Sequence, residues 1–195
     1  SQGLEFPVSF NFGAKRHSEC RRVLIQGLWI VTIYSLVMLV LPRFFTGFLY
    51  EIISDKSQAE QSVSYFHTSL WGVGPALVFT VLRIYLQALG RVAPAFYVLA
   101  GANVVNFLLD LALVLGMWGF PKWGVYGAAV ATNISRVFMM VVLIIYVVRT
   151  DARLRVLFKN FDLGMQTRKI KEILKIGLPS GLQVTFEGGV FSVST

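Results

Sequence analysis

The chain has 195 residues, of which 55% are hydrophobic and 14% are charged, and its formal net charge is +8 at pH 7. Its mean hydropathy of +0.66 is higher than one water-soluble core accommodates, so we expect lipid to cover part of its surface. The positive charge does not indicate nucleic-acid binding, because the Lys and Arg residues are spread over short segments between apolar runs. The composition therefore predicts a membrane protein and argues against a soluble domain.

Four apolar runs are long enough to cross ~30 Å of hydrocarbon as helices. They cover residues 23–41, 63–89, 95–117 and 124–148. None alternates apolar and polar residues as the strands of a membrane barrel do, so we predict an all-α, polytopic transmembrane helix bundle. Gly72, Gly74 and Pro75 are expected to bend the second run. Residues 4–12 are expected to be the inner end of a preceding span, and 176–195 the start of a further one.

Basic residues gather in the loops at one end of the predicted helices. Segments 13–22 and 149–175 hold most of the Lys and Arg residues, and the 90–91 turn adds one, whereas the opposite loops mix basic with acidic residues. Because cytoplasmic loops carry the Lys and Arg excess, we predict that the basic loops, with Cys20 among them, are cytoplasmic. Apolar residues repeat at helical spacing in 152–161, which favours a surface amphipathic helix over a solvated linker.

The third run carries three polar residues on one helical face. Asn103, Asn106 and Asp110 follow one another at spacings of three and four, and the rest of that helix is apolar. We expect this stripe to face the interior of the bundle, because a charge inside the membrane is costly without a partner or a wet cavity. A carboxylate one turn from an amide can coordinate Na⁺ or hold a proton; interhelical hydrogen bonding is the structural alternative.

Three further charged residues lie within predicted spans. Glu187 lies in the last apolar segment, where it could exchange protons or pair with a residue elsewhere in the protein. Arg83 is close enough to the cytoplasmic end of its helix for its side chain to reach the interface. Arg136 lies in the middle of the fourth run and needs a partner that the sequence does not identify.

Several segments together carry a family resemblance. They are Phe12-Gly13-Ala14, the sequence YLQALGR at 85–91 with Pro94 behind it, NFLLD at 106–110, GAAVAT at 127–132, and GLPSGLQ at 177–183 followed by Glu187. In this order and at these loop lengths the chain resembles the multidrug and toxic compound extrusion (MATE) family. The resemblance covers nearly the whole chain.

The resemblance implies a twelve-helix protein with two six-helix lobes, of which this chain holds the third to sixth spans and the start of the seventh. Residues 1–148 would then belong to the amino-terminal lobe, 149–175 would form a cytoplasmic inter-lobe linker, and 176–195 would begin the carboxy-terminal lobe. The expected location is the bacterial inner membrane. The expected partners within it are membrane lipids and the missing helices of the same chain.

The resemblance also implies a function and a set of site residues. By this resemblance the chain is similar to antiporters that export amphipathic or cationic small molecules in exchange for Na⁺ or H⁺. Such proteins are expected to have no enzymatic activity and no cofactor. Asn106, Asp110 and Thr132 match the family's cation site in the amino-terminal lobe, where Na⁺ could bind, and Glu187 matches an acid of the seventh helix. Both sites also use aspartates outside this chain, so the sequence does not choose between Na⁺ and H⁺.

Three other functions stay open at this stage. A lipid-linked oligosaccharide flippase of the same superfamily would use a more cationic cleft, to which Arg83 and Arg136 could contribute. A membrane-embedded hydrolase would use Asp110 and Glu187 as an acid pair, but no protease-like motif surrounds them. A structural subunit without transport would tolerate apolar replacement of both acids.

Overall fold

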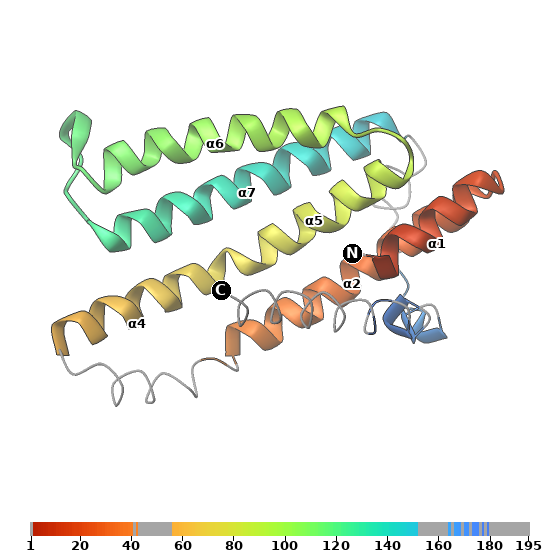
Figure 1. The fold of residues 1–195 in the computed structure, drawn as a ribbon, viewed down its shortest axis with the longest axis horizontal. Helices are drawn as coiled ribbons and strands as arrows, with labels where there is room; N and C mark the ends of the chain where they lie inside the picture. Colours follow the sequence, from red (N-terminus) through yellow and green to blue (C-terminus); the bar gives the residue numbers. More distant parts are fainter. Residues whose placement is uncertain are drawn as a thin grey trace, which may run out of the picture. The chain divides into compact units, whose positions relative to one another are not determined.

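The computed structural model describes residues 2–40, 42 and 56–151, together with 164, 166–168, 170, 171, 173–175, 177 and 179. Within these ranges the regular elements are helices and no strand occurs. They are α1 (Gln2–Gly13), α2 (His17–Val40), α4 (Lys56–Trp71), α5 (Val73–Ala88), α6 (Ala93–Leu113), the short 3-10 helix η2 (Met117–Gly119) and α7 (Val125–Thr150) (Figure 1). The predicted all-α class is confirmed.

Three of these helices, α2, α6 and α7, are individually long and apolar enough to cross a membrane. Residues Glu60–Trp71 of α4 and all of α5 pass the same test together, with a bend of 40° between them. Counted as one span, this pair completes the four spans predicted from the apolar runs.

The bend in the α4–α5 span lies at Gly72, as the sequence predicts. There the Gly72 N–H donates to the Ser69 carbonyl at 3.1 Å, one residue short of the regular α-helical partner. Pro75 lies in the first turn of α5, where an amide N–H has no helical partner to lose. Glycine therefore permits the break, and proline starts the new helix without further cost.

Two predicted boundaries are wrong. α6 ends at Leu113, not at 117, because Gly116 adopts a left-handed conformation with φ 74° and the Trp123 N–H donates to the Leu113 carbonyl at 2.9 Å. α2 begins at His17, so Cys20 lies on a helix and not in a loop. Hydropathy detects where the apolar stretch begins, and a helix can continue beyond it.

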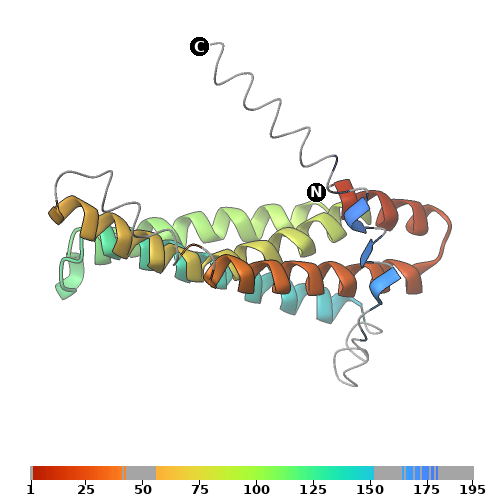
Figure 2. The same ribbon diagram turned by 90° about the horizontal axis from the view of Figure 1, so that it is seen from below.

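The chain divides into two compact units. Unit 1 consists of Ser1–Ile30, Val81–Val92 and Val147–Thr195, and unit 2 of Val31–Thr80 and Ala93–Tyr146. In unit 1, α1 doubles back along the first turns of α2 (Figure 2). Leu24 and Cys20 are buried there, and the Cys20 thiol is 3.5 Å from the Val8 carbonyl that accepts its hydrogen bond.

In unit 2, α6 and α7 pack through small residues. Ala112, Leu113 and Ala131 form a buried apolar cluster, and a Cβ added to Gly127 would lie 2.5 Å from the Leu113 carbonyl oxygen. Small residues at the start of the fourth apolar run permit this close approach.

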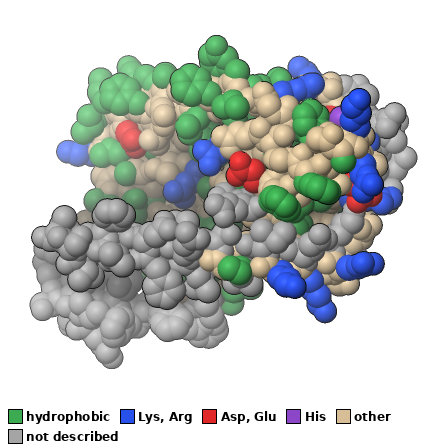
Figure 3. Space-filling model, turned by 45° about the vertical axis from the view of Figure 1, so that its right-hand side comes forward, with side chains coloured by type: hydrophobic (Ala, Val, Ile, Leu, Met, Phe, Trp, Pro, Cys, Tyr) green, Lys and Arg blue, Asp and Glu red, His purple; other side chains and the backbone are tan. Residues whose placement is uncertain are grey.

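Large apolar side chains also reach the surface of the protein. Phe96, Tyr97 and Phe107 of α6 are each more than half exposed, and green hydrophobic side chains gather at the upper left of Figure 3. In water such a surface would drive association, whereas lipid or neighbouring helices cover it in a membrane.

Candidate functional site

The polar stripe predicted on the third run lies on α6 in unit 2. Asn106 and Asp110 are each half-buried, and Asn103 is exposed. The Asn106 Nδ2 and Asp110 Oδ1 atoms are buried, and neither has a hydrogen-bond partner among the described residues. Asn103 therefore differs from Asn106 and Asp110, which lie one helical turn apart and each have a buried polar atom.

Unpartnered buried atoms of this kind are costly. Leaving a buried donor or acceptor unsatisfied costs about 1–3 kcal/mol, and more for a charged group. A protein that retains such atoms usually supplies them with water, an ion or a side chain. A carboxylate oxygen accepts from water or binds a hard cation, and an amide offers an oxygen or a donor depending on its rotation. The pair on α6 can therefore hold a proton, a water molecule or Na⁺.

Thr132 lies on α7, where the small residues meet α6. It is half-buried, and its neighbour Ala131 is fully buried in the cluster with Ala112. Within the described part of the chain no hydrogen bond joins the Thr132 hydroxyl to Asn106 or Asp110. The structure thus places Thr132 on the helix that packs against α6 without linking the three predicted ligands directly.

A second polar cluster lies where α7 passes the bend of the α4–α5 span. The Asn133 Nδ2 atom donates to the Thr68 carbonyl at 2.5 Å, and the shortened hydrogen bond at Gly72 leaves this carbonyl available. A Cβ on Gly72 would collide with Asn133 Oδ1 and would lie 2.9 Å from the Arg136 side chain. Glycine is therefore required both for the bend and for the closeness of α7.

Arg136 is half-buried at this cluster, and it has no ion pair with any residue that the structure describes. Asn133 Oδ1 beside it is buried and lacks a hydrogen-bond partner in the same part of the chain. The ion-pair partner expected for Arg136 is therefore not among the described residues. Sequence reasoning missed Asn133; its spacing of three from Arg136 on one helix was the available signal.

The other predicted charged residues are placed differently. Arg83 lies on α5 in unit 1, with its Nε atom buried and without a partner among the described residues. Gln87, one turn further on, is exposed. Glu187 and the amphipathic segment 152–161 lie outside the described residues, so their predicted placements stay predictions.

Known proteins resemble this chain in sequence and in fold. The MatE family model matches residues 1–112. A probable multidrug resistance protein NorM of Agrobacterium fabrum is 30% identical over 191 residues, covering 96% of this chain and 40% of that protein. The NorM of Synechocystis sp. is 26% identical over 190 residues, covering 97% of this chain and 41% of that protein. The chain thus spans about two fifths of the curated relatives it matches.

A solved structure shows the same fold. It is described as the inward-facing conformation of a multidrug resistance MATE family transporter of the MOP superfamily. The TM-score is 0.74 at 20% sequence identity, over 93% of this chain and 40% of that chain. The relatives are named as multidrug resistance proteins and the solved structure as a transporter, and none of these names describes an enzyme.

Proposed function

Because the chain belongs to the MatE family, we propose that the protein containing it is a secondary antiporter that exports amphipathic or cationic drugs in exchange for Na⁺ or H⁺. Membership in the family confirms the resemblance found in the sequence and makes the chain part of an integral membrane protein. The proposed location is the bacterial plasma membrane, since the relatives named above are bacterial.

The coupling ion is proposed to bind at Asp110 and Asn106. The observation that supports this site is the pair of buried atoms on α6, Asp110 Oδ1 and Asn106 Nδ2, that lack partners among the described residues. A proton on the carboxylate would remove its charge, and Na⁺ would bind its oxygen together with the amide oxygen after rotation of the Asn106 side chain. Thr132 on α7 is proposed to add a hydroxyl oxygen.

Ion binding at this site would drive transport only by favouring one conformation over another. A ligand with equal affinity for two conformations shifts nothing, so the site must hold its ion more tightly in one state of the lobe. Drug and ion then influence each other through a coupling free energy of about 1–3 kcal/mol. Glu187 is proposed as a second ion-binding acid, in the carboxy-terminal lobe.

The test is ethidium efflux from everted vesicles that contain the full-length protein. A Na⁺ gradient and a pH gradient are applied separately to the wild type, to Asp110→Asn and to Asn103→Leu. Asn103 is the matched control because it lies on the same helix but is exposed, and we assign it no part in the ion site.

We expect one gradient to drive efflux in the wild type and in Asn103→Leu, and to fail in Asp110→Asn. The amide of the variant cannot take up a proton as a carboxylate does, and it offers no negative charge to Na⁺. Wild-type efflux by Asp110→Asn at equal expression would exclude the proposed site. Whichever gradient works identifies the ion.

A lipid-linked oligosaccharide flippase is the second candidate, and Arg136 is the observation that favours it. A half-buried guanidinium within a span, with no ion pair among the described residues, would suit the phosphate of a lipid-linked sugar. Loss of envelope polysaccharide in cells lacking the protein, with unchanged drug accumulation, would support the flippase over the antiporter. The hydrolase and the structural subunit gain no such support.

A further inference from the structure

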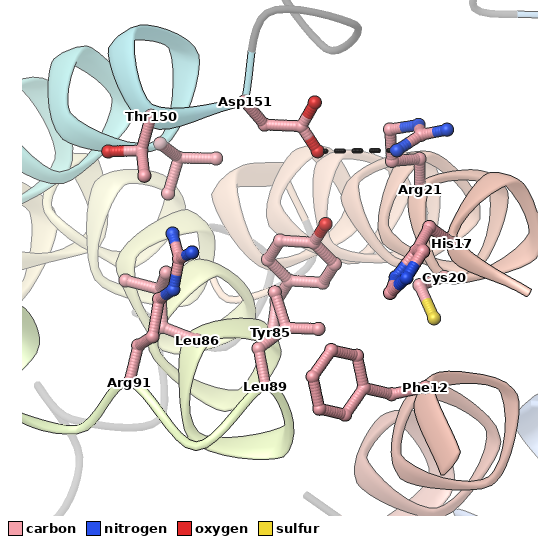
Figure 4. A pocket seen from close by; sticks show the side chains of 11 residues that line it. Phe12, His17, Cys20, Arg21, Tyr85, Leu86, Leu89, Arg91, Thr150 and Asp151 are labelled. Carbon is pink, nitrogen blue, oxygen red and sulfur yellow. Dashed lines mark hydrogen bonds and ion pairs between the residues drawn. The ribbon is translucent and has the colours of Figure 1, made fainter. Parts of the chain in front are cut away.

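A pocket in unit 1 lies outside the proposed ion site. Its volume is about 390 Å³, and it is lined by the first turns of α2, the last turns of α5 with the following turn, and the end of α7. Figure 4 shows Arg21 and Asp151 facing each other across one side of it, with the Tyr85 hydroxyl directed toward the space between them. The Arg91 guanidinium enters from the other side, near Thr150.

Among the residues that the structure describes, the lining of the pocket carries more positive than negative charge. Two guanidinium groups, those of Arg21 and Arg91, line it together with one carboxylate, that of Asp151. The Arg21 side chain is only 9% exposed, and its Nη1 atom is 3.5 Å from Asp151 Oδ2. Charge-assisted bonds between these groups are usually about 2.7–2.9 Å long, so this ion pair leaves Arg21 with donor capacity. A second anionic group would therefore be favoured.

The remaining walls combine hydrogen-bond donors with apolar surface. His17 adds an imidazole at the start of α2, and Leu86 and Leu89 form an apolar wall beside Tyr85. Phe12, which is 39% exposed, lines the pocket from the end of α1. This combination suits a molecule with a small anionic group and a hydrocarbon part.

We propose that this pocket binds a phosphate group, which the Arg21 and Arg91 guanidinium groups hold and to which the Tyr85 hydroxyl donates. Planar guanidinium groups match phosphate oxygens in two-point contacts, which an ammonium group does not provide. Asp151 positions the Arg21 side chain, and Arg91 supplies the surplus positive charge.

The source of the phosphate is proposed to be an anionic phospholipid of the inner leaflet. The pocket lies at the helix ends where the basic residues gather, which the distribution of Lys and Arg assigns to the cytoplasm. Basic pockets between transmembrane helices on that side bind anionic lipid headgroups. The apolar wall would contact the glycerol and the first carbons of the acyl chains. A soluble phosphate compound shares the same chemistry and is distinguished by the test below.

The experiment is native mass spectrometry of the full-length protein in a mild detergent. Dioleoylphosphatidylglycerol is titrated against dioleoylglycerol, which has the same acyl chains and no phosphate, and inorganic phosphate is titrated in a separate arm. The variants are Arg91→Gln and Arg21→Gln. The matched control is Arg149→Gln, because Arg149 is an exposed arginine in the last turn of α7 that does not line the pocket.

We expect dioleoylphosphatidylglycerol to bind the wild type and Arg149→Gln equally well. It should bind each pocket variant at least about tenfold more weakly, because each variant loses one charge-assisted contact. Dioleoylglycerol should not bind at the pocket. If inorganic phosphate shows the same variant dependence and the lipid does not, the phosphate site stands and its source is a soluble compound.

Two results would overturn the proposal: equal weakening by Arg91→Gln and Arg149→Gln, or no phosphate-dependent binding in either arm. Arg21→Gln removes a buried group and could prevent folding, whereas Arg91 lies exposed in a turn, so Arg91→Gln alone decides the outcome. Asp110→Asn should bind the lipid like the wild type, which keeps this test independent of the proposed antiport.

Discussion

Asn106 on α6 and Asn133 on α7 are both amides within apolar spans, but their surroundings differ. Asn133 Nδ2 donates at 2.5 Å to the Thr68 carbonyl at the bend of the α4–α5 span. Asn106 Nδ2 lies on an unbroken helix and has no partner among the described residues. The comparison teaches that an amide inside a membrane holds structure together where a helix break offers it a carbonyl, and stays available to a ligand where no break does.

The largest effect that would sharpen this comparison is expected for Asn106→Leu. Efflux driven by the coupling gradient should fall by roughly 5- to 150-fold, the range of a typical coupling free energy. The free energy of unfolding should stay the same or rise, because leucine has a similar size and removes an unsatisfied donor. Vesicle transport and unfolding in mixed micelles measure the two quantities. A parallel loss of transport and stability would make Asn106 structural, like Asn133.

The next largest effect is expected for Gly72→Ala. The added methyl group would collide with Asn133 Oδ1 and approach the Arg136 side chain, so either α7 or the bend has to shift. We expect a loss of about 1–3 kcal/mol in the free energy of unfolding, as for overpacking in a tight core. Unfolding of the purified protein in mixed micelles measures it. Unchanged stability would show that the α7 side chains move aside easily.

A smaller loss is expected for Asn133→Ala. It removes the hydrogen bond to the Thr68 carbonyl, which is only part-buried, and should cost about the net value of one such bond, 0.5–1.5 kcal/mol. The same mixed-micelle unfolding measures this loss. Gradient-driven efflux per folded molecule should change far less than in Asn106→Leu. If Asn133→Ala abolishes efflux without altering stability, the two amides do not differ in the way proposed here.

The smallest effect, with the opposite sign, is expected for Gly101→Ala. Gly101 lies within α6, and a Cβ there would meet no atom within 4 Å. Alanine should therefore stabilise the protein by about 0.5–1 kcal/mol through helix propensity alone. This variant is the matched control for Gly72→Ala, measured by the same unfolding experiment. Destabilisation here would indicate that a helix outside the described residues packs on this face.

The sequence predicted the spans and the bend well, because both depend on local chemistry. Apolar runs of sufficient length form helices in lipid, and glycine and proline close together, as at Gly72 and Pro75, are a common cause of a helix bend. The errors lie at the ends of helices. The end of α6 depends on the turn at Gly116 and on the hydrogen bond from Trp123, neither of which hydropathy detects.

The candidate site was only partly predictable, for a different reason. Spacing placed Asn103, Asn106 and Asp110 on one face, but it could not distinguish exposed Asn103 from the other two, because burial depends on which helix packs alongside. It also could not show that Asn133 meets Thr68, since 65 residues separate them in sequence. Contacts of this range follow from packing and not from local pattern.

The burial of Cys20 has a practical consequence for labelling experiments. It is the one cysteine in this sequence and is only 1% exposed, so thiol-reactive probes will reach it poorly while the protein is folded. Cysteines introduced at exposed positions such as Tyr65 or Phe96 can therefore carry spin labels or fluorophores with Cys20 still in place. Distances between such probes can then be measured without first replacing the buried Cys20.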